Sequence, residues 1–149
     1  MKYVKTLRTV ALCALWVLAS VSCKQETPAA PGKKVFPWYI YKEGSSFKEL
    51  EPVKDIIHSI SIFGNPPRSF IDECHRNQIE VYKAVGGSEE NINTTEKTEA
   101  LVNEYIKECT TYGYDGIDLD FEHLDPEFRE TYSQFLELAS RKLHAAGKK

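Results

Sequence analysis

Short apolar runs alternate with amphipathic segments along most of the chain. Runs with the composition of strands, bounded by Pro, Gly or polar residues, lie at 38–41, 56–64, 79–87 and 114–122. Segments in which apolar residues recur every three or four positions indicate helices at 67–78, 95–113 and 125–147. This alternation predicts parallel strands joined by right-handed crossovers.

The ends of the predicted helices carry specific signals. Pro67 lies near the start of the first helix, and Gly113 is placed to end the second. In the last helix Asp125 is the predicted N-cap and Pro126 the first helical residue. The buried stripe of that helix is predicted to contain Phe128, Tyr132, Phe135, Ala139, Leu143 and Ala146.

The fourth predicted strand, YDGIDLDFE, concentrates acidic side chains. Because strand side chains alternate between faces, Asp118, Asp120 and Glu122 share one face. The other face, which we expect to pack on helices, holds three apolar residues: Ile117, Leu119 and Phe121. Carboxyl groups so close together cannot all ionise, so one is expected to retain a proton, which suits general acid catalysis near neutral pH.

These residues carry a resemblance to family 18 glycoside hydrolases, the chitinases and their relatives. DGIDLDFE matches the family signature Asp-x-x-Asp-x-Asp-x-Glu, and KAVGG at 83–87 resembles its Ser-x-Gly-Gly motif, with Ala84 in place of Ser. IHSISIFG and the segment after it are closest to the chitobiase-like branch. The resemblance implies an α/β fold for 35–149, the N-terminal half of a (β/α)8 TIM barrel, with about four parallel strands and outer helices.

The resemblance also implies roles for the site residues. Glu122 would be the general acid and base, Asp120 would orient the 2-acetamido group of the substrate, and Asp118 would share a proton with Asp120. The substrate would be a β-linked N-acetylglucosamine oligosaccharide or chitin-like glycan, cleaved with retention and without metal or cofactor. The remaining residues predicted for the site are Asp115 and Gly116 as structural members of the motif, and Tyr114, Gly86, Gly87 and Trp38 as substrate contacts.

Other interpretations of the same residues stay open. Clustered carboxylates also bind calcium, although the alternating apolar residues fit a strand better than a calcium loop. Gly86 and Gly87 are equally suited to a tight turn, and Trp38 to a core. A lectin-like protein that binds chitin oligosaccharides without cleaving them is a second functional class, and the presence of Glu122 favours an enzyme over it. An endo-β-N-acetylglucosaminidase acting on glycoprotein glycans is a third candidate.

The N-terminal residues predict export. Residues 1–22 have a basic start, an apolar run and small residues, as in an export signal peptide, rather than a buried helix. Cys23 and the polar segment 23–34 resemble a bacterial lipoprotein signal with its flexible tether, and simple cleavage near Ser22 is the alternative. The protein is therefore expected to be secreted or attached to the cell envelope, with membrane contact only through a lipid on Cys23.

Composition and length add three limits. The chain has 149 residues, enough for one domain, whereas a complete (β/α)8 barrel needs roughly 200–250 residues. We therefore expect either the N-terminal half of a longer enzyme or the product of a broken gene. The formal net charge is −3 and no basic patch stands out, so nothing indicates nucleic-acid binding. Cys74 and Cys109 are either a disulfide pair or small buried hydrophobes.

Overall fold

A computed structural model describes residues 35–149, which form one compact unit. The predicted signal at 1–22, the tether at 23–34 and the lipidation at Cys23 lie outside the described residues. The elements, in chain order, are β1 (Trp38–Ile40), η1 (Phe47–Glu49), η2 (Glu51–Val53), β2 (Ser59–Phe63), α1 (Arg68–Arg76), β3 (Glu80–Gly86), α2 (Glu89–Ile92), α3 (Thr95–Tyr112), β4 (Gly116–Asp120), η3 (Pro126–Phe128) and α4 (Arg129–Ala145). Within this described part, no helix is both long and apolar enough to cross a bilayer.

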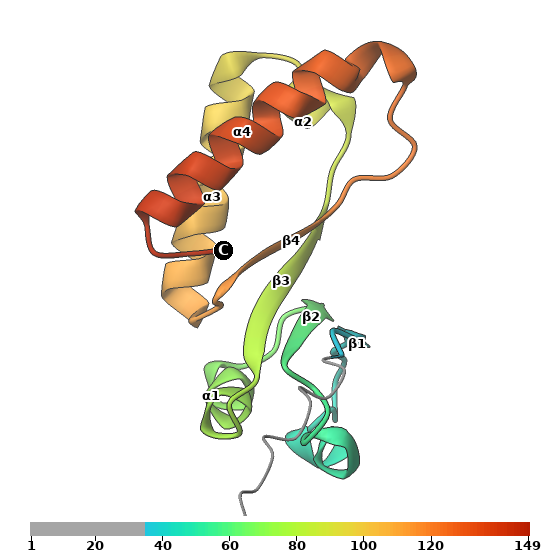
Figure 1. Cartoon of the computed structure of the whole chain (residues 1–149), viewed down its shortest axis with the longest axis vertical. Coiled ribbons are helices and arrows are strands. Elements are labelled where there is room, and N and C mark those ends of the chain that lie inside the picture. The colour runs from blue at the N-terminus through green and yellow to red at the C-terminus, as the bar shows by residue number, and fades with distance from the viewer. Residues whose placement is uncertain (1–34) are drawn as a thin grey trace, which may run out of the picture. The chain divides into compact units, whose positions relative to one another are not determined.

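The four strands form one parallel sheet in the order β1-β2-β3-β4, as predicted. α1, α3 and α4 lie on one side of it (Figure 1). The strand register explains why the helices gather there. The side chains of Ile60, Val81 and Ile117 point to the helix side, and the register pairs Ile60 with Val81 and Val85 with Leu119 on that side. Lys83, which pairs with Ile62 and Ile117, is the charged exception. The sheet therefore has a helix side, which forms the core, and an open side.

The helix side is buried in two clusters of side chains. The first joins β2 and β3 to α1 and includes Ile60, Ile62, Phe70, Ile71 and Val81. The second joins α3 to α4, and Leu119 and Phe121 of the fourth-strand region pack against it. The apolar face predicted for the fourth strand is thus the face that supports the helices, and the carboxylates are left on the other face.

The two cysteines of the described part are free thiols in the core. Cys74 and Cys109 have no exposed surface, and each packs in the first cluster. Burial raises the pKa of the Cys74 thiol to about 12 and that of the Cys109 thiol to about 11, because a thiolate loses its hydration there. The structure therefore favours small buried hydrophobes over a disulfide pair.

Several element boundaries differ from the prediction, among them the start of β2, which was expected at residue 56 and lies at Ser59. The fourth strand was expected over 114–122, but β4 is shorter, and residues 121–122 follow it as irregular chain. Asp125 was expected to cap one long helix. It caps η3 instead, with Oδ1 accepting from the N–H of Glu127 at 3.1 Å, and α4 begins only at Arg129. The predicted stripe of α4 is buried at Phe135, Ala139 and Leu143, whereas Ala146 is exposed.

Other helix signals agree with the structure. α3 begins after Thr94, whose side chain accepts from the N–H of Lys97, and it ends at Gly113, which has the left-handed φ of +87°. Pro67 is the N-cap of α1. The single turn of α2 was not predicted, because four residues are too few to show a helical period.

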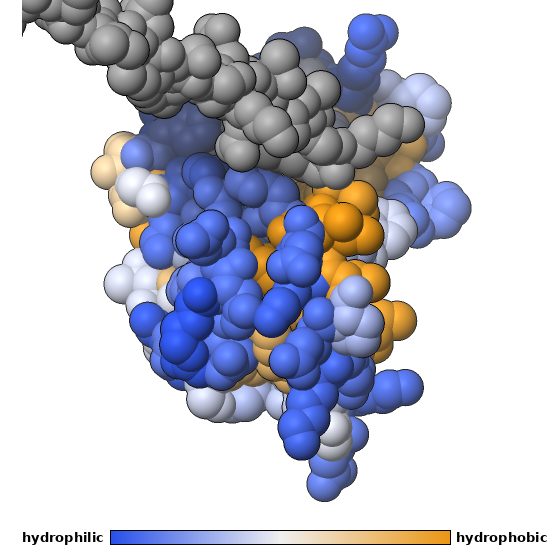
Figure 2. Space-filling model, turned by 60° about the horizontal axis from the view of Figure 1, so that its bottom comes forward, coloured by the Kyte–Doolittle hydropathy of each residue, from blue (hydrophilic) through white to orange (hydrophobic). Residues whose placement is uncertain are grey.

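Apolar side chains remain exposed near the first strand. Trp38 and Ile40 are 66% and 69% exposed, and the register places both on the open side of the sheet. Val35 and Phe36, just before the strand, are also exposed. Figure 2 shows hydrophobic surface on an otherwise mainly hydrophilic face of the molecule. The open side is therefore apolar at β1 and acidic at β4.

Candidate functional site

The three predicted carboxylates lie along the end of one strand. Asp118 and Asp120 point to the open side of β4 and are half-buried. Glu122 comes just beyond the strand, and its side chain is 67% exposed. Phe121, between the two last acids, is turned to the helix side, where its ring lies 5.2 Å from that of Phe135. Phe121 thus continues the alternation of β4, with apolar side chains toward the helices and acidic side chains away from the core.

Trp38 joins this group from the opposite edge of the sheet. Its indole Nε1–H donates to Asp118 Oδ2 at 3.2 Å. β2 and β3 lie between the two strands, so a flat sheet would separate β1 from β4 by roughly 14 Å, more than these side chains can bridge. The sheet must therefore curl toward its open side, as it does in a barrel.

Small residues of β3 lie beside the acids on the open side of the sheet. In the register Ala84 lies next to Asp118 and Gly86 next to Asp120. A Cβ built on Gly86 would meet only the backbone oxygen of Asp120, at an ordinary 3.5 Å. A Cβ on Gly87 would lie 2.2 Å from the ring of Phe121. Gly87 is thus required for packing against Phe121, whereas Gly86 borders the open side.

Asp115 is separate from the other acids and, as expected for a structural member of the motif, makes contacts within the fold. Its Oδ2 accepts from the backbone N–H of Val81 at 2.7 Å and lies 2.8 Å from Nε2 of His75. One carboxylate thereby ties α1, β3 and the start of β4 together. Gly116 follows, and a Cβ there would lie 2.1 Å from the carbonyl oxygen of Lys149. Both residues have contacts that support the strand rather than a ligand.

Tyr114 does not face a ligand in this structure. It is 1% exposed and belongs to the first core cluster, where its ring lies 6.4 Å from that of Tyr112. Tyr114 precedes β4, which begins at Gly116. A side chain so enclosed presents no free surface to a sugar in the described part of the chain.

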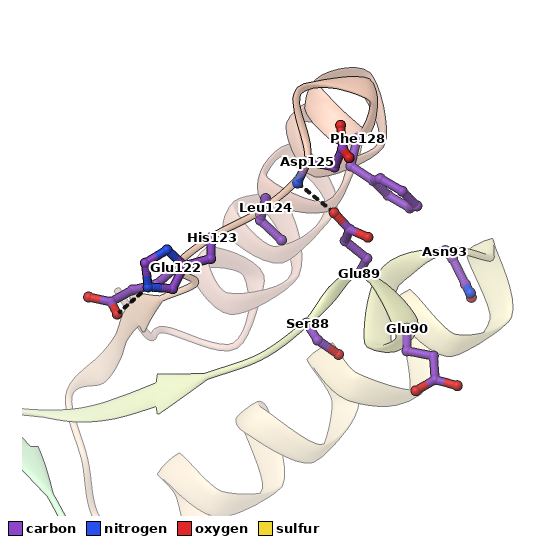
Figure 3. A pocket seen from close by; sticks show the side chains of 9 residues that line it. All are labelled: Ser88, Glu89, Glu90, Asn93, Glu122, His123, Leu124, Asp125 and Phe128. Carbon is purple, nitrogen blue, oxygen red and sulfur yellow. Dashed lines mark hydrogen bonds and ion pairs between the residues drawn. The ribbon is translucent and has the colours of Figure 1, made fainter.

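A cleft of about 590 Å³ opens beyond the carboxyl ends of β3 and β4. Figure 3 shows Glu122 and His123 together at one end of it, with His123 Nε2 3.8 Å from Glu122 Oε2. Further along, Glu89 accepts from the backbone N–H of Asp125 at 2.6 Å. His123 has a left-handed φ of +57°, uncommon outside Gly, which turns the chain sharply after the acid.

Two residues in this region were not predicted from the sequence. Glu89 lies in the short α2, and it fixes the segment after Glu122 through a backbone contact that has no sequence signal. His123 has no sequence signal either, because its place beside Glu122 depends on the turn of the chain. Among residues 35–149, no three His, Cys, Asp or Glu side chains come together as a metal site would require.

Comparisons with known proteins place the chain among chitinase-like folds. No family model matches it. The cortical fragment-lytic enzyme of Bacillus subtilis (strain 168) is 43% identical over 47 residues, which are 32% of this chain and 11% of that protein.

Solved structures are similar over most of the described chain. They include a chitinase from Chromobacterium violaceum ATCC 12472 (TM-score 0.62, 18% identity, 76% of this chain and 44% of that one). The spore cortex-lytic enzyme SleL of Bacillus megaterium QM B1551 is similar with a TM-score of 0.65 and 17% identity, over 80% of this chain and 34% of that one. A class V chitinase from Pseudomonas fluorescens Pf-5 matches 76% of this chain and 43% of its own, at 18% identity and a TM-score of 0.62.

The chain therefore spans less than half the length of these relatives. At such identities the likeness is one of fold, and it confirms the predicted fold class: four parallel strands with outer helices, as in part of a chitinase TIM barrel. The predicted resemblance to chitinase-like glycoside hydrolases is confirmed at that level.

Proposed function

We propose that residues 35–149 carry the acid-bearing part of a site that hydrolyses glycans containing β-linked N-acetylglucosamine. The observation that carries the proposal is the placement of Asp118 and Asp120 on the open side of β4, with Glu122 just beyond the carboxyl end of this parallel strand. Active sites of barrel enzymes lie at that end of the strands. The similar fold of chitinases and cortex-lytic enzymes supports the same class of substrate.

In the proposed mechanism Glu122 is the general acid and then the general base. It protonates the glycosidic oxygen as the bond to the leaving sugar breaks, and it later takes a proton from the attacking water. Its position beyond the strand suits this role, because the side chain is free to reach the substrate and is neighboured by His123 at 3.8 Å. The short irregular segment after β4 gives the acid this freedom.

Asp120 and Asp118 act on the substrate's own nucleophile. In a substrate-assisted retaining reaction the 2-acetamido oxygen attacks the anomeric carbon and forms an oxazolinium ion. Asp120 orients the acetamide N–H and stabilises the positive charge that develops. Asp118 lies behind it on the same strand and shares a proton with it. The mechanism needs the acid furthest along the chain, and the order is Asp118, Asp120, then Glu122.

A second candidate is glycan binding without hydrolysis. The exposed Trp38 favours it, because an indole face on the open side of the sheet is suited to stacking against a sugar ring. A binding protein would release an intact oligosaccharide, whereas an enzyme would release shorter products.

The proposal is tested in a chimera that forms a complete barrel. Residues 35–149 would be joined to the second half of the Chromobacterium violaceum chitinase, and the fold of the chimera would be checked by circular dichroism. We expect release of a fluorescent leaving group from a chitobioside by the chimera, and none above background by the 149-residue chain alone. Turnover by the purified monomeric chain would refute the proposal that the half-site is inactive, and an intact oligosaccharide with a folded chimera would favour the binding protein.

We also propose export with lipid attachment at Cys23, on the pattern of residues 1–34. In a bacterial host, mass spectrometry of the exported chain should show a diacylated or triacylated N-terminal Cys23. An unmodified N-terminus at or near Cys23 would reject the anchor.

A further inference from the structure

We propose that Trp38 is a positioning residue for Asp118, and that its indole N–H sets the orientation of that carboxylate. The contact is the 3.2 Å hydrogen bond from Nε1 to Oδ2 across the open side of the sheet. The physical contact stands on the structure alone, while its effect on catalysis rests on the proposed function.

The neighbours of Asp118 on the sheet leave this role to the indole. Ala84, next to it in the register, has no polar atom in its side chain. Tyr82, on the same face of β3, donates its hydroxyl to Glu80 Oε2 at 2.9 Å and is therefore engaged elsewhere. Within the described chain, the side-chain hydrogen bond found for Asp118 is the one from Trp38.

The charges that face Asp118 are negative. Asp120 follows it on the same face of β4, Glu122 comes just beyond the strand, and Glu80 lies on the same face of β3. The open faces of β1 and β2 carry no charged residue, and Lys83 of β3 is turned to the helix side, where its amine donates to Asn65 Oδ1 at 3.0 Å. A neutral donor is thus what the sheet offers to hold this carboxylate.

An indole is well suited to this task. Its N–H can donate but not accept, so it engages one carboxylate oxygen and leaves the other free to interact with Asp120. The ring is supported by Phe63, whose centroid lies 5.9 Å away at an interplanar angle of 88°. Trp38 is nevertheless 66% exposed, so one face remains available to a sugar. Stacking of a sugar on this ring would therefore act directly on the orientation of Asp118.

The contact is tested by the indole resonances of the full chain. The chain has two tryptophans, Trp16 and Trp38, and the ¹H–¹⁵N signal lost in Trp38→Phe is that of Trp38. We expect the Trp38 proton to move upfield and to exchange faster with solvent in Asp118→Ala. The matched control is Asp120→Ala, which removes a carboxylate from the same face but not the acceptor. An unmoved signal in Asp118→Ala, or an equal shift in both variants, would overturn the proposal.

The effect on catalysis is measured in the chimera with a complete barrel. Trp38→Phe keeps a ring for stacking but removes the donor, so kcat should fall by about 10-fold with little change in KM, the size expected for a hydrogen bond to a charged group. Trp38→Ala should also raise KM. An unchanged kcat in Trp38→Phe would refute the positioning role even with the spectrum as expected. An inactive chimera with the expected spectral shift would count against the proposed function and leave the contact established.

Discussion

Gly87 offers a sharp test of how the site is supported. In Gly87→Ala the new Cβ would lie 2.2 Å from Cζ of Phe121, and two more ring atoms of Phe121 are within 2.8 Å. The ring would have to retreat by roughly 1.3 Å to reach an ordinary carbon contact of about 3.5 Å. It cannot do so freely, because it packs against Tyr132 and Phe135, with ring centroids at 5.7 and 5.2 Å.

Overpacking of this kind typically costs about 1–3 kcal/mol, partly offset by about 0.4–1 kcal/mol from the lower entropy of the unfolded chain. We therefore expect Gly87→Ala to lower the free energy of unfolding by about 1–2 kcal/mol, measured by urea denaturation with circular dichroism. Gly86→Ala is the matched control, because its Cβ would meet the oxygen of Asp120 at 3.5 Å. Its stability should be equal to or slightly above that of the wild type.

The double variant Gly87→Ala with Phe121→Leu isolates the clash. Phe121→Leu alone should destabilise the protein by loss of ring packing, but adding Gly87→Ala to it should cost much less than adding it to the wild type. The reasoning would be refuted if Gly87→Ala were as stable as the wild type, if Gly86→Ala were equally destabilised, or if the two changes at 87 and 121 were strictly additive.

Two further predictions concern the support of β4 and the core. Asp115→Ala should lower the free energy of unfolding by about 1–3 kcal/mol in urea denaturation, because the N–H of Val81 and the ring of His75 lose their acceptor. A loss below about 0.5 kcal/mol would contradict the role of Asp115 in holding α1, β3 and β4 together. Cys74 and Cys109 should resist a maleimide in the folded protein at pH 8 and react after unfolding, measured by mass spectrometry of their peptides. Rapid labelling of the native state would contradict their burial. Burial raises both thiol pKa values above the ordinary 9.0, to about 12 and about 11. The folded state therefore keeps protons that the unfolded chain releases, so this part of the stability is complete below about pH 9 and should decline as the pH rises toward 11–12.

The sheet and the direction of the acids could be predicted from sequence because both depend on local periodicity. The alternation of apolar and acidic residues around Leu119 predicted which side chains face the helices. The alternation of strands and helices along the chain predicted that the strands are parallel. The hydrogen bond from Trp38 to Asp118 could not be predicted in the same way. It joins residues 80 positions apart, and it depends on the curl of a whole sheet.

The surroundings of two predicted site residues depend on packing that the sequence does not show. Tyr114 lies just before β4, which begins at Gly116, and its side chain is enclosed in the core. Gly87 matched a family motif, whereas the structure requires Gly there for the ring of Phe121. A motif shows that Gly stands at a position, whereas the packing around the backbone shows why Gly is needed there.

The central claim is that Glu122 is the acid of a glycan-hydrolysing site, and Glu122→Gln tests it most directly. Gln keeps the shape of the side chain but has no proton to give, and general acid catalysis typically contributes 10²- to 10⁴-fold. In the completed barrel, the rate of chitobioside hydrolysis by Glu122→Gln should fall by about that factor, while the affinity for an uncut chitin oligosaccharide, measured by calorimetry, stays close to that of the wild type. Asp125→Asn, at the other end of the same cleft, should keep most of the activity and serves as the control. Full activity in Glu122→Gln would contradict the assignment of the acid.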